Sequence, residues 1–300
     1  SDMSESVAEA RKRLAADLLR AGVRPGCPLL LHSSLSSIGT VPGGADTVLD
    51  ALLDSVGPEG TLCLPTLSYL FTTAESPSFD VRTTPTNLGT LPETFRQRPG
   101  VVRSLHPTHS CAAYGPQAMA LTSAHGEDRT PVGPRSPFRR IYDLGGQVAF
   151  LGCGTRCNTS MHGVEELYGE RHGGAPPPYL LQETTFTYSV TDAEGQTTAA
   201  EHRRHAFDNV GQRYERVEAL LPPGTHRTGP VGKGTIVVME ARGMWEAALA
   251  ALADDPLCLV EAIAPGSESH FLKPSSRPGI WRYEIGPAPS TSSHSCLSSQ

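Results

Sequence analysis

The sequence predicts an α/β fold with a mixed central sheet, flanking helices and an inserted antiparallel hairpin. Residues 28–67 run strand, glycine-rich turn, helix, strand, which is a βαβ unit with an expected right-handed crossover. Residues 148–168 give a second strand, tight turn and helix start. Thr184–Val190 and Gln196–Ala200 are predicted to pair around a turn at residues 192–195. Strands and helices in this mixed order indicate an α/β architecture.

Length and composition are typical of a globular chain with one large domain. The chain has 300 residues, of which 38% are hydrophobic, and its 30 Gly and 26 Pro residues indicate a high loop content. We expect a single domain over residues 4–285, built as one unit or as two intimate subdomains. The Ser- and Pro-rich residues 286–300 are predicted to be a disordered tail.

Charge and cysteine content narrow the range of partners. A formal net charge of −6 argues against nucleic-acid binding. The chain has 7 Cys residues without framework spacing, which favours a reducing compartment over a disulfide scaffold. No apolar run approaches the length of a membrane span, and no secretory signal is visible. We expect a soluble cytoplasmic protein with no membrane partner, and a homodimer remains open.

The remaining elements follow from hydrophobic periodicity and from breakers. Helices are predicted where apolar residues recur at helical spacing, at Ser4–Ala21, at the stretch after Asp46 that ends at Gly57, and at Leu91–Gln97, Gln117–Ala124, Pro137–Leu144, Phe207–Leu221 and Gly243–Ala253. Strands are predicted at short apolar runs, namely Pro28–His32, Thr61–Leu67, Val101–Leu105, Val148–Leu151 and Val231–Met239. Residues 72–90 are predicted to be a loop.

The stretch 148–168 holds the strongest candidate for chemistry. Gly152 and Gly154 permit a sharp turn after the strand, and Asn158 or the next residue can cap the following helix. His162 and Glu165 are three residues apart on that helix, so the carboxylate can orient the imidazole. The alternative is a helix-surface histidine with an i,i+3 partner and no role in catalysis.

Three other segments admit a functional or a plain structural interpretation. Gly43-Gly44 before a helix can present backbone N–H groups to an anion, or can be only a tight turn. His106 and His109 flank a proline and are either a metal pair or polar loop residues. Residues 201–205, Glu-His-Arg-Arg-His, are either a solvent-exposed charged run or part of a site.

Taken together, four segments resemble the antibiotic N-acetyltransferase family, the aminoglycoside 3-N-acetyltransferases, whose fold is distinct from that of the GNAT acetyltransferases. The segments are residues 30–39 with Gly43-Gly44, residues 60–66, residues 103–110, and residues 151–162 with its Asn-Thr-Ser-Met-His run. No single segment is diagnostic, but the ordered set is specific and spans most of residues 10–260.

The resemblance implies a reaction and a set of site residues. Family members transfer the acetyl group of acetyl-CoA to an amine, usually the 3-amino group of a 2-deoxystreptamine ring. It identifies His162 as the general base, with Glu165 and Glu201 as the associated acidic residues. The further residues that we assign to the site are Ser33, Ser34, Val41, Gly43, Gly44, Arg103, Ser104 and His109 for acetyl-CoA, and Tyr69, Asp80, Asn158 and His202 for the amine; no metal is implied.

Three alternatives remain beside acetylation of an aminoglycoside. Residues 201–205 depart from the pattern of resistance enzymes, which suggests the same chemistry on another natural-product amine, in biosynthesis or self-resistance. A metal-dependent hydrolase would use His106, His109, His202 and His205. A family member that has lost activity would only bind CoA or another ligand. Within the transferase, direct transfer competes with a nucleophile at Cys153 or Cys157.

Overall fold

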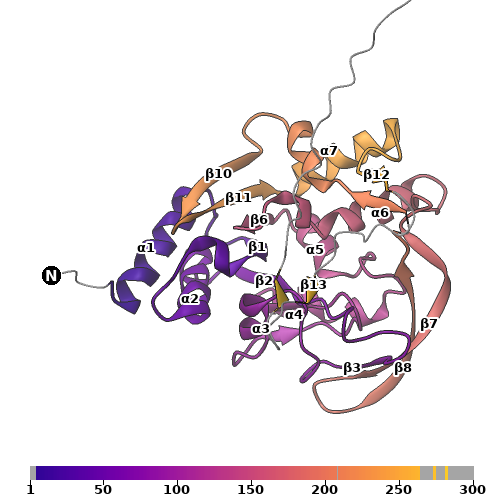
Figure 1. Cartoon of the computed structure of the whole chain (residues 1–300), viewed down its shortest axis with the longest axis horizontal. Helices are drawn as coiled ribbons and strands as arrows, with labels where there is room; N and C mark the ends of the chain where they lie inside the picture. Colours follow the sequence, from indigo (N-terminus) through magenta and orange to yellow (C-terminus); the bar gives the residue numbers. More distant parts are fainter. Residues whose placement is uncertain (1–4, 208, 264–272, 275–280, 283–300) are drawn as a thin grey trace, which may run out of the picture.

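A seven-stranded mixed sheet organises the computed structural model, which describes residues 5–207, 209–263, 273–274 and 281–282 (Figure 1). The strand order is β10-β11-β6-β1-β2-β5-β4. These strands span, in chain order, β1 Pro28–Ser33, β2 Thr61–Pro65, β4 Val102–Arg103, β5 Cys111–Tyr114, β6 Gln147–Leu151, β10 His226–Val231 and β11 Gly234–Glu240. The predicted mixed sheet is therefore confirmed.

The three central strands are parallel and the outer ones are antiparallel. β1 pairs in parallel with β2 on one side and with β6 on the other. β11 and β5 then continue the sheet in antiparallel fashion. The predicted βαβ unit is present, because β1 and β2 are parallel neighbours joined through a helix. The carboxyl ends of β1, β2 and β6 consequently meet at one edge of the sheet.

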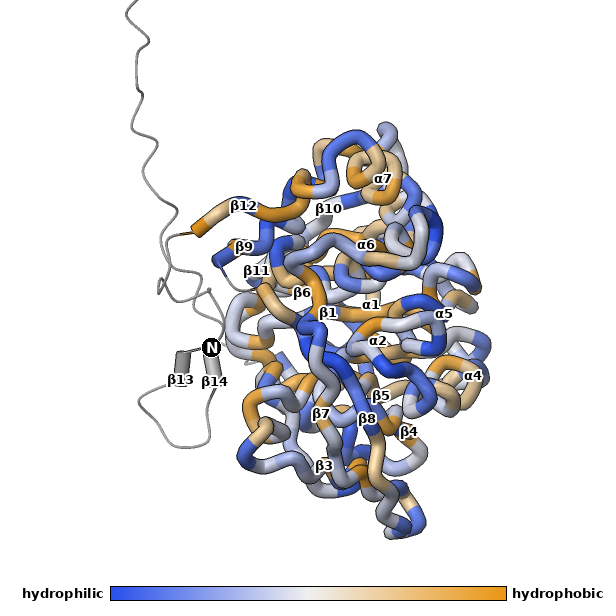
Figure 2. The backbone as a smooth tube through the Cα atoms, turned by 90° about the vertical axis from the view of Figure 1, so that its right-hand side faces the viewer, coloured by the Kyte–Doolittle hydropathy of each residue, from blue (hydrophilic) through white to orange (hydrophobic). Residues whose placement is uncertain are grey.

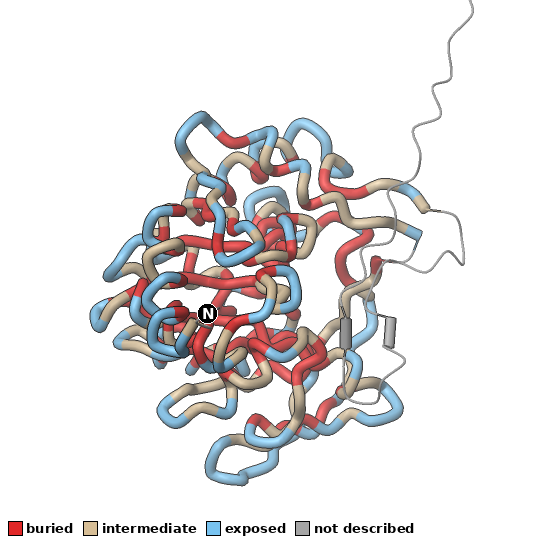
Figure 3. Tube along the Cα trace, turned by 60° about the vertical axis from the view of Figure 1, so that its left-hand side comes forward, coloured by how far each residue is buried: buried red, intermediate tan, exposed pale blue. Residues whose placement is uncertain are grey.

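Seven helices lie on the two faces of the sheet in the described part of the chain. They are α1 Val7–Arg20, α2 Gly44–Val56, α3 Thr90–Arg96, α4 Ala118–Thr122, α5 Pro137–Asp143, α6 Ser160–Arg171 and α7 Ala241–Asp254. α1, α2 and α3 share one hydrophobic core with Leu29 and Leu31, whereas α4 to α7 share the other with Leu30. Alternate residues of a strand point to opposite faces, so β1 feeds both cores. Figure 3 shows these buried strands between exposed peripheral segments.

Hydropathy separates the central strands from the hairpin. Figure 2 shows hydrophobic tube along β1 and β6 and hydrophilic tube along much of β8. None of the described helices has the length and apolar character needed to cross a bilayer.

The predicted hairpin is present and longer than expected. β7 Leu181–Thr191 pairs with β8 Thr197–His205, and the short β3 Ser78–Asp80 adds a parallel strand to β7. The strand β3 lies inside residues 72–90, which were predicted to be a loop. Two further pairs are β9 Val210–Gln212 with β12 Val260–Ala262, and β13 Lys273–Pro274 with β14 Trp281–Arg282.

One predicted helix was wrong, for an identifiable reason. The predicted helix Phe207–Leu221 is replaced by β9 and the 3₁₀ helix η4 Tyr214–Leu220, because Phe207 and Asn209 have φ of +26° and +63°. The strand predicted within Val231–Met239 is confirmed as β11, whereas its partner β10, joined to it by a turn at Gly232 with φ of +57°, was not predicted.

Two smaller differences concern β5 and α2. β5 was not predicted, and its short apolar run pairs between β2 and β4. α2 begins at Gly44 after a left-handed Gly43, so Asp46 lies in the first turn and is not the N-cap. The domain limits at residues 4 and 285 and the tail at 286–300 lie outside the described residues and stay predictions.

Candidate active site

A cavity of about 410 Å³ lies at the edge where the parallel strands end. His32 and Ser33 at the end of β1, Pro65 of β2 and Cys153 just after β6 line one side of it. The opposite wall comes from the end of β8 and the segment that leads to η4. Open α/β sheets bind ligands outside the carboxyl ends of their strands, so this cavity is the expected position for a site.

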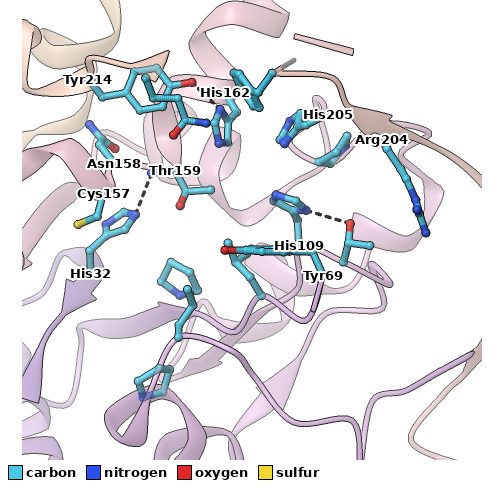
Figure 4. A pocket seen from close by; sticks show the side chains of 18 of the residues that line it. His32, Tyr69, His109, Cys157, Asn158, Thr159, His162, Arg204, His205 and Tyr214 are labelled. Atoms are coloured by element: carbon cyan, nitrogen blue, oxygen red, sulfur yellow. Dashed lines mark hydrogen bonds between the residues drawn. The ribbon is translucent and has the colours of Figure 1, made fainter. Parts of the chain in front are cut away.

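His162 lines the cavity from the first turn of α6 and is 6% exposed. Its Nδ1 lies 2.7 Å from the hydroxyl oxygen of Tyr214 (Figure 4). That hydroxyl donates to Oε2 of Glu165 at 3.0 Å. The direct distance from Nδ1 to Oε2 is 3.6 Å. The imidazole and the carboxylate are therefore linked through a tyrosine. Among the described residues, Nε2 of His162 has no hydrogen-bond partner, which leaves it free to meet a ligand.

Burial determines the charge state of both groups. Glu165 is fully buried, and desolvation raises its pKa to about 8, although the hydroxyls of Tyr179 and Tyr214 partly offset this. Tyr179 donates to Oε1 of Glu165 at 2.7 Å. Desolvation lowers the pKa of His162 to about 3, so its imidazole is neutral at pH 7. A neutral imidazole is the form that can accept a proton.

The local sequence explains how α6 delivers His162 to the cavity. Gly152 and Gly154 adopt φ of +72° and +68°, which turns the chain sharply after β6. Oδ1 of Asn158 accepts the N–H of Ser160 at 3.1 Å. Nε2 of His32 accepts the N–H of Thr159 at 3.1 Å and so ties the helix start to β1. These bonds fix the first turn of α6 above the sheet edge.

Further aromatic and imidazole rings surround His162. The ring centroids of His205, Phe207 and His109 lie 4.3, 5.0 and 6.3 Å from that of His162. Nε2 of His205 is buried and has no hydrogen-bond partner among the described residues. Burial lowers the pKa of His109 and of His205 below the usual value, and the neighbouring His162 adds to this effect. The cavity wall is therefore largely neutral.

Five of the predicted site residues line this cavity. They are Ser33, Tyr69, His109, Asn158 and His162. Glu165 lies directly behind His162, as the resemblance implied. The residues that were predicted from separate segments of the chain thus meet at one place.

Glu201, His202 and Asp80 are not brought to the cavity. Glu201 is exposed on β8 opposite Thr187, because neighbouring strand residues point to opposite faces and His202 takes the inward position. His202 is buried against the ring of His106 at 4.6 Å, outside the cavity lining. Asp80 follows Phe79 on β3 and is paired with Arg82 at 2.7 Å. The structure therefore contradicts the predicted position of Glu201 beside His162 and of the other two in the amine site.

Arg103 and Ser104, predicted to bind acetyl-CoA, have structural partners. The Arg103 guanidinium donates to the carbonyl oxygen of Thr66 at 3.0 Å and to Oγ of Ser110 at 3.0 Å, and it stacks over Phe79. Ser104 is buried, with Oγ 2.8 Å from Nδ1 of His125. Neither residue lines the cavity, because their polar atoms are used to join β4 and β5 to neighbouring loops.

The glycine-rich turn after β1 also lies beside the cavity lining and not in it. The N–H of Ser34 donates to the carbonyl of Leu151 at 2.8 Å, and Val41 is buried in the core. Gly43 and Gly44 have φ of +78° and +62°. A Cβ on Gly43 would lie 2.2 Å from Oγ1 of Thr47, which is a structural reason for glycine there. Their role toward CoA stays a prediction.

The geometry gives no support to a metal site or to a cysteine nucleophile. Within the described ranges, no cluster of three or more His, Cys, Asp or Glu side chains could hold a metal ion. Sγ of Cys157 lies 2.9 Å from Sγ of Cys153 and donates to the carbonyl of Gly154, and it is not bonded to His162. The pKa of Cys157 is raised by its bond to Cys153 and by burial, which disfavours the thiolate.

Tyr214, Tyr179, Arg204 and Phe207 were not predicted as site residues. Tyr214 reaches His162 from η4 and Tyr179 reaches Glu165 from the start of the hairpin, so only the tertiary fold brings them to α6. Tyr214 lies in the middle of the predicted helix Phe207–Leu221, and Tyr179 precedes the predicted hairpin. Neither position carries a sequence signal that identifies a partner.

Known proteins with related sequences and folds include acetyltransferases. The aminoglycoside 3-N-acetyltransferase family model matches residues 30–253. Aminoglycoside N(3)-acetyltransferase VII of Streptomyces paromomycinus is 34% identical over 77% of this chain and 87% of that protein. A histidine-to-alanine mutant of aminoglycoside acetyltransferase AAC(3)-IVa in complex with a gentamicin superposes with a TM-score of 0.69 at 29% identity, over 86% of this chain and 93% of the other.

A third relative was solved with the coenzyme. AAC-IIIb in binary complex with CoASH gives a TM-score of 0.68 at 26% identity, over 81% of this chain and 96% of the other. These matches confirm the predicted fold class and the predicted acyltransferase class. Because the family model matches well over half of the residues, the chain belongs to the aminoglycoside 3-N-acetyltransferase family.

Proposed function

We propose that the chain transfers the acetyl group of acetyl-CoA directly to an amino group of an aminoglycoside, the 3-amino group of 2-deoxystreptamine, with His162 as general base. The acceptor is suggested by the relatives, whose names and complexes specify aminoglycosides. The co-substrate is supported by the relative that was solved with CoASH. The base is supported by the position of His162 in the cavity.

The geometry of His162 is the observation that carries this proposal. Its Nδ1 is held at 2.7 Å by the Tyr214 hydroxyl, with the buried Glu165 behind it, while the residue itself lines the cavity and its Nε2 has no hydrogen-bond partner among the described residues. An ammonium group is no nucleophile, so the acceptor first loses one proton to solvent and reacts as the neutral amine. His162 can then take the second proton from this nitrogen at Nε2 as the nitrogen attacks the thioester carbonyl carbon.

The same residue can complete the reaction. As the new C–N bond forms and the C–S bond breaks, the imidazolium of His162 returns its proton to the departing thiolate sulfur. An ionised Glu165 stabilises the imidazolium through Tyr214. No covalent enzyme intermediate is needed, since the thioester is already activated. Holding both reactants beside one imidazole supplies much of the rate gain.

A second acceptor class is favoured by one observation. Among the described residues, Arg204 lines the cavity and no Asp or Glu does, whereas a polycationic aminoglycoside is best matched by carboxylates. Phe207 lines the cavity, and the next residue in the sequence, Asp208, lies outside the described residues. The alternative is therefore the same transfer to a less cationic natural-product amine.

A panel of amines assayed with acetyl-CoA tests both acceptors. Free-thiol release gives the rate, and mass spectrometry of the products gives the site of the added acetyl group. Acetylation at the 3-amino group of a 2-deoxystreptamine aminoglycoside supports the first acceptor. Turnover of other amines with no aminoglycoside turned over would reject it in favour of the second. No acetylated product from any amine would contradict the proposed reaction.

A further inference from the structure

Tyr214 occupies the gap between the candidate base and the candidate acid. Its hydroxyl oxygen is 2.7 Å from Nδ1 of His162 and 3.0 Å from Oε2 of Glu165, which are closer contacts than the 3.6 Å between those two atoms. Tyr214 is 1% exposed and is 49 residues downstream of Glu165 on a separate element. The Tyr214 hydroxyl, which comes from a different element, therefore mediates the hydrogen bonding between His162 and Glu165 of α6.

Counting protons on these three groups gives two limiting arrangements in which the charge of Glu165 sets the direction of both bonds of Tyr214. A tyrosine hydroxyl has one hydrogen and can donate one bond while it accepts another. When Glu165 is ionised it can only accept, so Tyr214 donates to it and accepts the hydrogen of His162 Nδ1. Nε2 of His162 is then unprotonated and faces the cavity as a base.

The second arrangement reverses both bonds. When Glu165 is protonated and donates to Tyr214, the tyrosine hydrogen turns toward Nδ1 of His162. That nitrogen becomes the acceptor, so the hydrogen of the neutral imidazole resides on Nε2. In this state His162 presents an N–H to the cavity and cannot remove a proton from an amine.

We infer that Tyr214 is a positioning residue that converts the charge state of Glu165 into the tautomer of His162. The inference rests on the proposed role of His162 as base and deepens it. The second tyrosine gives a natural comparison, because Tyr179 donates to Oε1 of Glu165 at 2.7 Å, whereas the described bonds to His162 include none from it. Tyr179 can thus tune Glu165 without acting on the tautomer.

The surrounding groups leave this switch to Glu165. Among the described residues, Glu165 faces Tyr179, Tyr214 and His162, and Cys258 is a further titratable neighbour. Burial and the adjacent Glu165 raise the pKa of Tyr214 further above neutrality, so it stays protonated.

On the cavity side, the titratable groups that face His162 among the described residues are histidines. His109 and His205 lie beside its ring, and the pKa of His32 is lowered by burial and in part by His162. Burial keeps all three neutral at pH 7. Of the described groups around His162, Glu165 is the one left to change charge near neutrality, because its pKa is about 8.

The pH dependence of turnover in tyrosine variants tests the inference. Wild-type kcat should rise with pH as Glu165 ionises. Tyr214→Phe should lower kcat by about 10-fold to 100-fold, below the ~10²–10⁴-fold of a lost general base, and should remove that ionisation from the profile. The matched control, Tyr179→Phe, should keep the step and move it to higher pH, because the carboxylate loses one donor. A Tyr214→Phe profile that is parallel to the wild type would overturn the inference.

A measurement without substrate separates this inference from the proposed reaction. Nitrogen-15 NMR of histidine-labelled protein reports the tautomer directly. The wild-type His162 should carry its proton on Nε2 at low pH and on Nδ1 once Glu165 ionises. A tautomer that stays constant through that range would reject the role of Tyr214, even if an amine is acetylated. If the tautomer of His162 changes as expected but no amine is acetylated, the proposed reaction is rejected, whereas the coupling of His162 to Glu165 through Tyr214 is retained.

Discussion

Replacing Glu165 with Gln tests whether ionisation of this buried carboxyl lowers the unfolding free energy of the protein. Glu165 is fully buried, and its pKa is about 8 in the folded protein against a usual value of 4.5. A carboxyl with a raised folded pKa contributes stability that is fully present below its unfolded pKa and is lost as the pH rises through the folded value. Gln has nearly the same shape and carries no charge at any pH.

The size of the effect follows from these two pKa values. One pKa unit corresponds to about 1.4 kcal/mol, so wild type should lose about 3 kcal/mol of its unfolding free energy from this group between about pH 5.5 and pH 8.5. The unfolding free energy of Glu165→Gln relative to that of the wild type should therefore rise by about 3 kcal/mol from the lower to the higher pH.

Urea unfolding at both pH values measures this difference. Glu194→Gln, at the exposed turn of the hairpin, is the matched control and should follow the wild type throughout. A Glu165→Gln variant with the same pH dependence as the wild type would refute the reasoning, because the carboxyl would then be solvated or already ionised without penalty.

The remaining predictions concern predicted site groups that have no bond to His162. Cys157→Ser should retain turnover, since Cys157 contacts Cys153 and not His162; loss of activity with an intact fold would restore the nucleophile hypothesis. Arg103→Met should lower the unfolding free energy by about 2 kcal/mol or more through the lost bonds to Thr66 and Ser110, with the acetyl-CoA Kd unchanged; a much weaker Kd in a stable variant would return it to the coenzyme site.

Short-range patterns predicted the centre of the fold. The βαβ unit at residues 28–67 combines a buried strand, paired glycines and a helix of amphipathic spacing, and each of these signals is local. The hairpin of β7 and β8 was equally accessible, since alternating residues flank an Asp-Ala-Glu-Gly turn. Where all local signals agree, the tertiary structure follows them.

Prediction failed where backbone conformation was decided by distant contacts. The segment from Phe207 to Leu221 has helical periodicity, yet two residues with positive φ divide it and Gly211 pairs with Glu261 across β9 and β12. For the site, the pair His162 and Glu165 was visible from spacing along one helix. The hydroxyls of Tyr179 and Tyr214 were not, because no spacing connects segments that meet only after folding.

Glu201 illustrates the limit of transferring a role by resemblance alone. Its neighbourhood departs from the family pattern, and strand alternation puts its side chain in solvent while His202 is buried. His205, three residues further, does reach His162. Strand alternation accounts for the exposed Glu201 beside the buried His202, whereas Arg204 and His205 both line the cavity at the end of β8, which the composition of the run could not reveal.

The most direct test of the whole account is a paired measurement of kcat and acetyl-CoA affinity for His162→Ala. Loss of a general base should lower kcat by about 10²–10⁴-fold at saturating substrates, while calorimetry gives an acetyl-CoA Kd close to that of the wild type. A variant that keeps its turnover at saturation and loses coenzyme affinity instead would contradict the account, because His162 would then bind the coenzyme and take no part in proton transfer.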